Sequence, residues 1–585
     1  MIKCKIILLQ SQYRLAQIIP IGDSKYEPIE INISDYKVFH NDVVEFDYET
    51  KTVKNVLETE IKEIDIVGVL MIRSQYKYGF NKRRYPIYLF KPFDFHYPDF
   101  LVASGIKKSK GVKENQLAVI RYNKWERKIP NGMIREIIGS VGDIKAEYDS
   151  ILHKYNLNKS PPKLKELNKR KNLHDIFGNE LSNYTDIRKL KVISIDPPNC
   201  TDIDDALSLE KEKDGHMIGI HIANVSSFIE KFNLFDKILN RCSTIYAPHK
   251  KVNMIPTILS DNFASLIEGK ERISLTLWIK LDEEFNITGY KYEECLLVNK
   301  KAYSYKEAQK KLKRDSMLKD LYEISKHLAK NINYEVEEYD MHKMIEVYMI
   351  LANHLTAEYL MENDSPCIFR SHKSKKHSID FNKIDKNLVP FLKIFQSNAA
   401  EYTTYQGDYY HYGLNICKYS HFTSPIRRLP DILIHMLIKQ VMGQSMSKYH
   451  LEEICINCNE IAKKIKKMDR DFNRIDIVKN TDTETIYEAY IISLDDNKIT
   501  IYCPELKFCD RIFLFDNKLS EMMNVEKYND NIIIKNKQTE ETIELKLYQK
   551  IKVKMIGILS NISIKNKLIV KILEPEIDLI LKSND

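Results

Sequence analysis

The stretch KVISIDPPNCTDIDDALSL, residues 191–209, sets four aspartates between two short apolar runs. The first run, 192–195, predicts a buried strand that ends at Asp196. The two prolines that follow exclude a helix and favour an extended turn. The second run, 206–209, predicts another strand. The acidic turn is therefore expected to lie beside a hydrophobic core.

Asp196, Asp202, Asp204 and Asp205 place four carboxylates within ten residues. Like charges raise each other's pKa unless a cation lies among them. Mg²⁺ prefers oxygen ligands and keeps water or phosphate in its shell, so it would remove that cost. The alternative is a solvated acidic turn that caps a short helix. The flanking apolar runs and the double proline favour the metal site.

The segment DPPNCTDIDDALSLE resembles the signature of the ribonuclease II/ribonuclease R (RNB) superfamily of 3′-to-5′ exoribonucleases, closest to the eukaryotic branch with the exosome catalytic subunit. The resemblance implies a multidomain α+β protein. A central mixed α/β RNB catalytic domain would be flanked by OB-fold β-barrels, two N-terminal and one C-terminal. The chain starts at the first barrel, so we expect the extra N-terminal endonuclease domain of that branch to be absent.

The length of 585 residues is too great for one hydrophobic core, so several domains are expected. Short strands spaced by turns predict small barrels at both ends. The expected divisions are OB or cold-shock-like domains at 1–62 and 63–150, a basic linker at 151–179, the catalytic domain at 180–475 and a C-terminal OB domain at 480–578.

The composition describes a globular protein with 90 Lys and Arg against 82 Asp and Glu. An acidic site in basic surroundings suits a polyanionic substrate. Ten cysteines without a pairing pattern favour a reducing, intracellular compartment. The apolar run 344–361 carries polar residues, which predicts a buried helix and no membrane span. Leu318, Leu321, Ile324, Leu328 and Ile332 are spaced as in an amphipathic helix.

Two basic stretches suit RNA as well as an ordinary surface. In the second barrel, aromatic and cationic side chains alternate, as single-stranded RNA binding requires, although a plain barrel surface is an equal alternative; they are Tyr76, Lys77, Tyr78, Lys82, Arg83, Arg84, Tyr85 and Tyr88. The run 159–173 holds six lysines and arginines and one glutamate. A solvated linker is the default there, and a phosphate-facing collar is the alternative.

The resemblance continues through four further motifs. It places Tyr246 against the last nucleotide, Glu346 on the terminal ribose and Arg370, in IFRSH, on the RNA backbone. For His372 of the same motif a structural role is favoured. Asn224 replaces the usual aspartate of HIADVS, which puts a supporting carboxylate in doubt.

The segment HFTSPIRRLPDILIH, residues 421–435, is the second strong signature. Thr423–Ser424–Pro425 predicts a helix start, whose free N–H groups would attract phosphate. The resemblance assigns Arg427 to the scissile phosphate, and Arg428 is a further substrate-binding candidate. Asp431 and His435 are expected to pair, and Leu429 replaces a usual tyrosine.

Together these residues predict a processive, hydrolytic 3′-to-5′ exoribonuclease that degrades single-stranded RNA to nucleoside 5′-monophosphates. One or two Mg²⁺ ions, or Mn²⁺ in substitution, would be held by Asp196, Asp202 and Asp205. Asp204 and Arg427 would be catalytic.

The main alternative is a catalytically decayed RNA-binding or scaffold protein of an RNA-degradation complex. A DxD-type transferase would explain Asp202 and Asp204 but neither the barrels nor TSPIRR. We expect a monomeric nuclease in the nucleus, the cytoplasm or both, either alone or with an exosome-like core complex.

Overall fold

The two strands that flank the acidic turn are neighbours in one mixed sheet of the computed structural model. β12 (Val192–Asp196) pairs antiparallel with β13 (Asp205–Glu212) and parallel with β18 (Ile287–Ser304). The sheet runs β11-β18-β12-β13-β14-β17, and β17 pairs with β18 as well, so the sheet curls back on itself. Its other strands are β11 (Thr185–Asp186), β14 (Gly215–Ala223) and β17 (Glu271–Leu281). Both strands predicted around the turn are confirmed.

The structure describes most of the chain. The described residues are 1–9, 14–22, 25–76, 78–106, 114–332, 334, 338–373, 381, 384–396, 398–404, 407, 409–445, 449–482, 484–515 and 522–576.

Helices pack around the mixed sheet and, with one exception, share one hydrophobic core with it. They are α2 (His174–Phe177), α3 (Val225–Lys231), α4 (Phe235–Ile238), α5 (Tyr305–Lys311), α6 (Ser316–Asn331), α7 (Met341–Glu362), α8 (Val389–Gln396), α9 (Leu429–Val441) and α10 (Leu451–Asn480). The exception is α8, whose Leu392 packs with Tyr490 and Ile492 of the C-terminal part. The predicted amphipathic helix is α6, whose leucines 318, 321 and 328 are fully buried. The predicted buried helix is α7. No helix among the described residues is long and apolar enough to span a membrane.

Two short strand pairs complete this region, and the first of them contacts the acidic turn through Tyr246 and Lys251. They are β15 (Ile245–Ala247) with β16 (Lys250–Val252), and β19 (Ile368–Ser371) with β20 (Glu401–Thr404).

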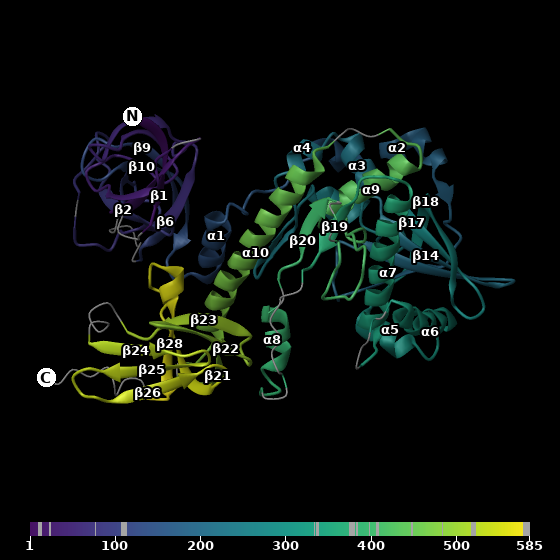
Figure 1. The fold of residues 1–585 in the computed structure, drawn as a ribbon. Helices are drawn as coiled ribbons and strands as arrows, with labels where there is room; N and C mark the ends of the chain where they lie inside the picture. The colour runs from purple at the N-terminus through teal and green to yellow at the C-terminus, as the bar shows by residue number, and fades with distance from the viewer. Residues whose placement is uncertain are drawn as a thin grey trace.

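The N-terminal part contains two five-stranded β units, as Figure 1 shows in purple and blue. The first is a sheet in the order β3-β2-β1-β4-β5, and the second is a closed barrel in the order β10-β8-β7-β6-β9. The strands are β1 (Ile2–Leu8), β2 (Leu15–Pro20), β3 (Ile29–Asn32), β4 (Val43–Asp47), β5 (Thr52–Glu58), β6 (Asp65–Leu70), β7 (Ile87–Pro92), β8 (Phe100–Ala103), β9 (Gln116–Lys124) and β10 (Asn131–Ser140). Tyr76 and Tyr85 of the proposed RNA-binding surface are exposed, whereas Lys77 lies outside the described residues.

The C-terminal part is again all β, with a five-stranded and a three-stranded sheet around one core. Its strands are β21 (Ile486–Asp495), β22 (Lys498–Cys503), β23 (Phe508–Phe513), β24 (Met523–Lys527), β25 (Asn531–Asn536), β26 (Thr542–Lys546), β27 (Lys550–Gly557) and β28 (Leu568–Glu574). In Figure 1 the long helix α10 crosses from the region of the mixed sheet to these strands.

A fully buried ion pair fastens the C-terminal strands to α1 (Ile144–Lys154). The Lys567 ammonium lies 2.8 Å from Glu147 and also donates to the carbonyls of Leu559 and Asn561 at 2.6 Å. On α10, Arg474 pairs with Asp510 at 2.7 Å. Buried charges need such complete pairing, so these contacts fix where the C-terminal barrel lies.

The basic run 159–173 is not the solvated linker that its composition favours. Leu164, Leu167 and Leu173 are buried in the main core, while the lysines of the run stay exposed. The leucines recur among the charges, and their burial holds the run against the catalytic region.

Candidate active site

Asp196 and Asp205 stand at facing ends of two paired strands. Asp196 ends β12 and Asp205 begins β13, which brings both carboxyls to the same edge of the sheet. Burial, and then the charge of Asp202, raises the pKa of Asp196 to about 6. Burial, followed by the charges of Asp196 and Asp204, raises the pKa of Asp205 well above its ordinary value. The carboxyls of Asp196 and Asp205 therefore lack the nearby positive charge that would keep both of them ionised.

Asp204 lies in the acidic turn and contacts the loop 423–428, which carries Arg427. Its Oδ1 accepts a hydrogen bond from the Ile426 N–H at 2.9 Å, and its Oδ2 lies 3.5 Å from Nε of Arg427. Burial raises the pKa of Asp204 to about 7, against the lowering effects of Arg427 and the Ile426 N–H. The Arg427 side chain remains 44% exposed, so its outer face is available to a phosphate.

The loop 423–428 is held by a buried carboxylate. Asp431 Oδ1 accepts from the Ser424 N–H and from Arg428, both at 2.7 Å. Asp431 is fully buried, and Arg428 is thus committed to it. Arg427 Nη2 donates to Ser424 Oγ at 2.9 Å, so the same loop fixes the arginine.

Two local predictions about this segment are wrong. The helix begins at Leu429, with Pro430 in its first turn, and not at Thr423–Ser424–Pro425. The N–H groups of Ser424 and Ile426 donate to Asp431 and Asp204. The Ser424 carbonyl accepts from the N–H groups of Arg427 and Arg428, so the segment forms a single turn that does not continue as a helix. His435 does not pair with Asp431, because its Nε2 faces the Phe422 carbonyl at 2.9 Å.

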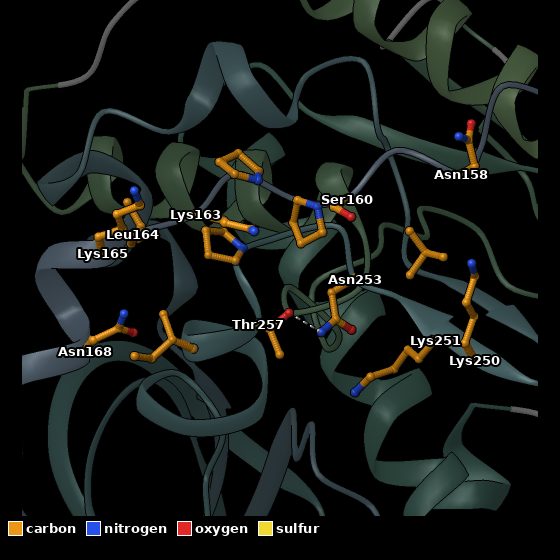
Figure 2. A pocket seen from close by; sticks show the side chains of 15 residues that line it. Asn158, Ser160, Lys163, Leu164, Lys165, Asn168, Lys250, Lys251, Asn253 and Thr257 are labelled. Atoms are coloured by element: carbon orange, nitrogen blue, oxygen red, sulfur yellow. Dashed lines mark hydrogen bonds between the residues drawn. The ribbon is translucent and has the colours of Figure 1, made fainter. Parts of the chain in front are cut away.

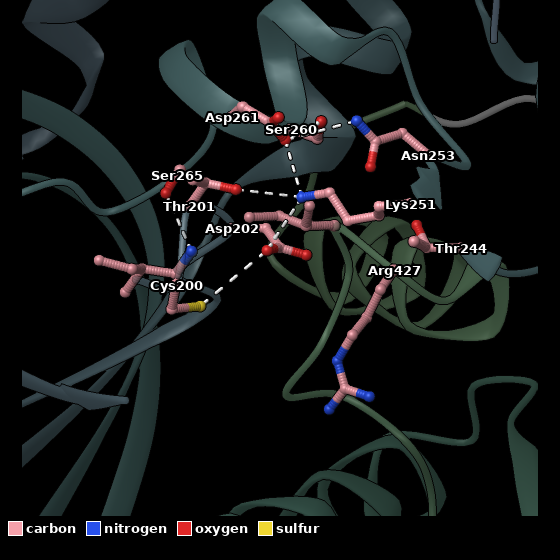
Figure 3. Close-up of polar contacts among 12 residues, drawn as sticks. Cys200, Thr201, Asp202, Thr244, Lys251, Asn253, Ser260, Asp261, Ser265 and Arg427 are labelled. Carbon is pink, nitrogen blue, oxygen red and sulfur yellow. Dashed lines mark hydrogen bonds and ion pairs between the residues drawn. The ribbon is translucent and has the colours of Figure 1, made fainter. Parts of the chain in front are cut away.

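Asp202 is bound by a tyrosine and a lysine. The Tyr246 hydroxyl donates to Asp202 Oδ2 at 3.1 Å, and the tyrosine is 54% exposed. A buried core tyrosine is thereby excluded, and a ring face is free to stack on a base. Lys251 lies 3.1 Å from Asp202 Oδ1, 3.0 Å from Asp261 and 3.1 Å from Thr201 Oγ1. Figure 3 shows this lysine on one side of Asp202 and the Arg427 side chain on the other.

The remaining predicted substrate residues lie outside this contact network. Glu346 forms an ion pair with Lys343 at 2.7 Å and is 42% exposed at its side chain. The Arg370 guanidinium lies 4.3 Å from the centre of the Tyr402 ring, and its Nη1 has no hydrogen-bond partner among the described residues. Burial raises the pKa of Tyr402 to about 12, against the charges of Arg428 and Arg370. Arg370 thus lies against the Tyr402 ring.

The two replaced family positions have structural roles. Asn224 caps α3, accepting from the Ser227 N–H, and donates to Glu294 at 2.7 Å. Leu429 is fully buried at the first turn of α9. His372 accepts from the Gly413 N–H at 2.9 Å, in keeping with its expected structural role.

Sequence reasoning missed Lys251 and Tyr305. Lys251 lies in β16, where it pairs with Tyr246 of β15, and no local pattern links it to Asp202. Tyr305 is the first residue of α5; burial and the charges of Asp205 and Asp196 raise its pKa. Tyr305 directly follows the long strand β18, whose end pairs with the end of β12 at Asp196. That position is the signal that could have placed Tyr305 near the acidic turn.

The acidic residues suit a hard cation in their chemistry. Asp196 Oδ2 is buried and has no hydrogen-bond partner in the described part of the chain. Oxygen donors with mutually raised pKa values are what Mg²⁺ or Mn²⁺ would stabilise. Within the described ranges, no three His, Cys, Asp or Glu side chains form a ready-made metal site. The metal assignment to Asp196, Asp202 and Asp205 stays a prediction.

Comparison with known proteins agrees with this geometry. Residues 184–444 match the family model described as RNB domain, and residues 87–156 match that of the Dis3-like cold-shock domain 2. Exosome complex exonuclease RRP44 of Mus musculus is 26% identical over 572 residues, covering 84% of this chain and 59% of its own length. Ribonuclease R of Aquifex aeolicus is 26% identical over 438 residues, covering 62% and 61%. The chain thus spans about three fifths of these relatives' length.

Solved structures show the same fold at low identity. Mycoplasma genitalium RNase R in complex with ribose methylated single-stranded RNA superposes with a TM-score of 0.72 at 17% identity, covering 97% of this chain and 100% of that one. Yeast Ssd1, described as a pseudonuclease, has a TM-score of 0.64 at 15% identity, covering 98% and 97%.

Proposed function

Residues 184–444 form an RNB domain behind a Dis3-like cold-shock domain, and on this basis we propose that the protein is a hydrolytic, processive 3′-to-5′ exoribonuclease acting on single-stranded RNA. Its products would be nucleoside 5′-monophosphates. The observation that carries the proposal is the contact of Asp204 with both the Ile426 N–H and Arg427, which sets an arginine against the acidic turn.

Each side chain of the site would have a separate role in binding or cleaving the RNA. The half-exposed Arg427 guanidinium would offset the charge that develops on the phosphate in the transition state. The exposed Tyr246 ring would stack on the terminal base, and Glu346 would bind the ribose hydroxyls that distinguish RNA from DNA. Arg370 would bind the backbone upstream. Because Arg428 is bound to Asp431, it would contribute to RNA binding only indirectly, by fixing the loop 423–428.

Mg²⁺, held by Asp196, Asp202 and Asp205, would supply an activated water and charge for the leaving oxygen. Mn²⁺ would substitute for it. Lys251 already neutralises Asp202 from the side away from Arg427, so the carboxylate is held in place before a cation arrives.

A decayed, RNA-gripping protein is the second candidate, because a fold neighbour, Ssd1, is described as a pseudonuclease. Four aspartates and the complete TSPIRR loop favour activity. Relatives named as exosome exonucleases also support association with an exosome-like core complex, which affinity capture of the native protein would test.

The test of activity uses uniformly labelled single-stranded RNA with Mg²⁺. We expect direct conversion of the full-length RNA to labelled nucleoside 5′-monophosphates and a short end product with few intermediates, full loss with EDTA and no degradation of the matched DNA. Binding of the RNA without mononucleotide release, in Mg²⁺ and in Mn²⁺, would contradict the proposal and favour the decayed protein.

A further inference from the structure

A cavity of about 630 Å³ lies next to the acidic site, between the basic run and the turn that carries Lys251. Lysines 163 and 165 line one side and lysines 250 and 251 the other, as Figure 2 shows. Among its lining residues, all of them described, there is no carboxylate. The cavity has the volume of a small-molecule site, which is roughly 300–1,000 Å³.

The walls of the cavity are built and fixed. Arg241 donates to the carbonyls of Lys159 and Ser160 at 2.8 and 3.3 Å and to the carbonyl of Asn253 at 2.7 Å. This arginine therefore clamps the basic run to the opposite wall. Leu164 of the same run is buried in the main core, which fixes this wall of the cavity.

The cavity also offers unsatisfied polar groups. Asn253 is 5% exposed, and its Oδ1 has no hydrogen-bond partner among the described residues, while its Nδ2 donates to Thr257 at 3.3 Å. Lys250 is paired with Asp149. Lys163 and Lys165 are exposed and form no ion pair within the part of the chain that the structure describes. Two free cations and a spare acceptor thus face one space.

Lys251 connects this cavity to the place where a phosphodiester would be cleaved. It lines the cavity and at the same time contacts Asp202, which also binds Tyr246. Hydrolysis changes a phosphodiester with one negative charge into a phosphomonoester with about 1.5 to 2 at neutral pH. A lysine-lined cavity beside the reaction therefore favours the product over the chain that is being cut.

We propose that this cavity binds the released nucleoside 5′-monophosphate, with Lys163 and Lys165 on the phosphate and Asn253 on the nucleoside. The proposal rests on the exonuclease function and extends it, because it gives the product a site of its own outside the aspartate cluster. Product bound there would inhibit the enzyme by slowing departure of the next nucleotide.

The test measures AMP binding by calorimetry on the full chain, separately from catalysis. The paired variant Lys163→Ala with Lys165→Ala should weaken AMP binding by about tenfold. The matched control, Lys169→Ala with Lys171→Ala, removes two lysines of the same run that do not line the cavity and should bind AMP normally. Inorganic phosphate and adenosine should each bind more weakly than AMP.

Activity gives an independent readout. Inhibition of RNA degradation by added AMP should weaken in the Lys163/Lys165 variant, with the initial rate unchanged. Equal AMP affinity in both paired variants would overturn the proposal. So would phosphate binding as tight as AMP binding, or a loss of RNA affinity with AMP binding retained. If no nuclease activity is found while AMP binding still depends on these lysines, the proposed function fails and the site remains.

Discussion

Lys567→Met is expected to release the C-terminal barrel from the rest of the protein. The side chains of Lys567 and Glu147 are both 0% exposed, and the ammonium makes three hydrogen bonds of 2.6 to 2.8 Å. Removal of one partner leaves the other charge buried and uncompensated, which costs roughly 3–5 kcal/mol. For a unit of this size, that lowers the melting temperature by more than about 10 °C.

Calorimetry and limited proteolysis of the full chain would measure this change. Lys552→Met is the matched control, because its ion pair with Glu574 lies in the same barrel with side chains 51% and 61% exposed. Exposed pairs contribute about 0–1 kcal/mol. The double variant Lys567→Met with Glu147→Leu should recover most of the loss, since no buried charge then remains.

The effect should depend on pH in a defined direction. Burial raises the pKa of Glu147 above its ordinary value, against the attraction of Lys567. A raised folded-state pKa means that protonation favours the fold, so stability is lost as the pH rises through that pKa. The single variant should thus be least stable at alkaline pH and improve as the pH falls toward 5. If Lys567→Met lost no more stability than Lys552→Met at every pH tested, this reasoning would be refuted.

Three further predictions concern the site. Arg427→Lys should lower kcat by about 10²–10³ in single-turnover assays while RNA binding changes little, because the planar fork on the phosphate is lost. Tyr246→Ala should weaken binding of a short RNA by about 1–3 kcal/mol in fluorescence titrations, since it removes the stacking face. Asp431→Asn should lower kcat about 100-fold in the same assays by loosening the loop around Ser424, with the fold retained in circular dichroism. Parental values in these assays would contradict the assigned roles.

Local patterns were sufficient for the regular elements of the catalytic region. Short apolar runs on either side of the acidic turn predicted β12 and β13, helical spacing predicted α6, and an apolar run with interspersed polar residues predicted α7. The start of α9 was misplaced. Thr423–Ser424–Pro425 has the chemistry of a helix cap, but the Ser424 N–H donates to Asp431 and the Ile426 N–H that follows donates to Asp204, which is far away in the sequence.

Tertiary contacts decided what the sequence could not show. Lys251 reaches Asp202 only through the β15–β16 pair. Leu164 and Leu167 look incidental in a basic run, yet both are buried in the main core, and Leu164 also lines the neighbouring cavity. Glu346 and Arg370 were assigned from resemblance, and their roles depend on RNA that would occupy the space between them and the aspartates.

The most direct test of the account is Asp204→Asn, assayed for mononucleotide release from labelled RNA. The amide keeps the shape and an acceptor for the Ile426 N–H but loses the charge that faces Arg427. We expect RNA affinity close to that of the parent protein, with hydrolysis abolished. Degradation of the RNA at the parental rate would show that the acidic turn is not the site of the chemistry.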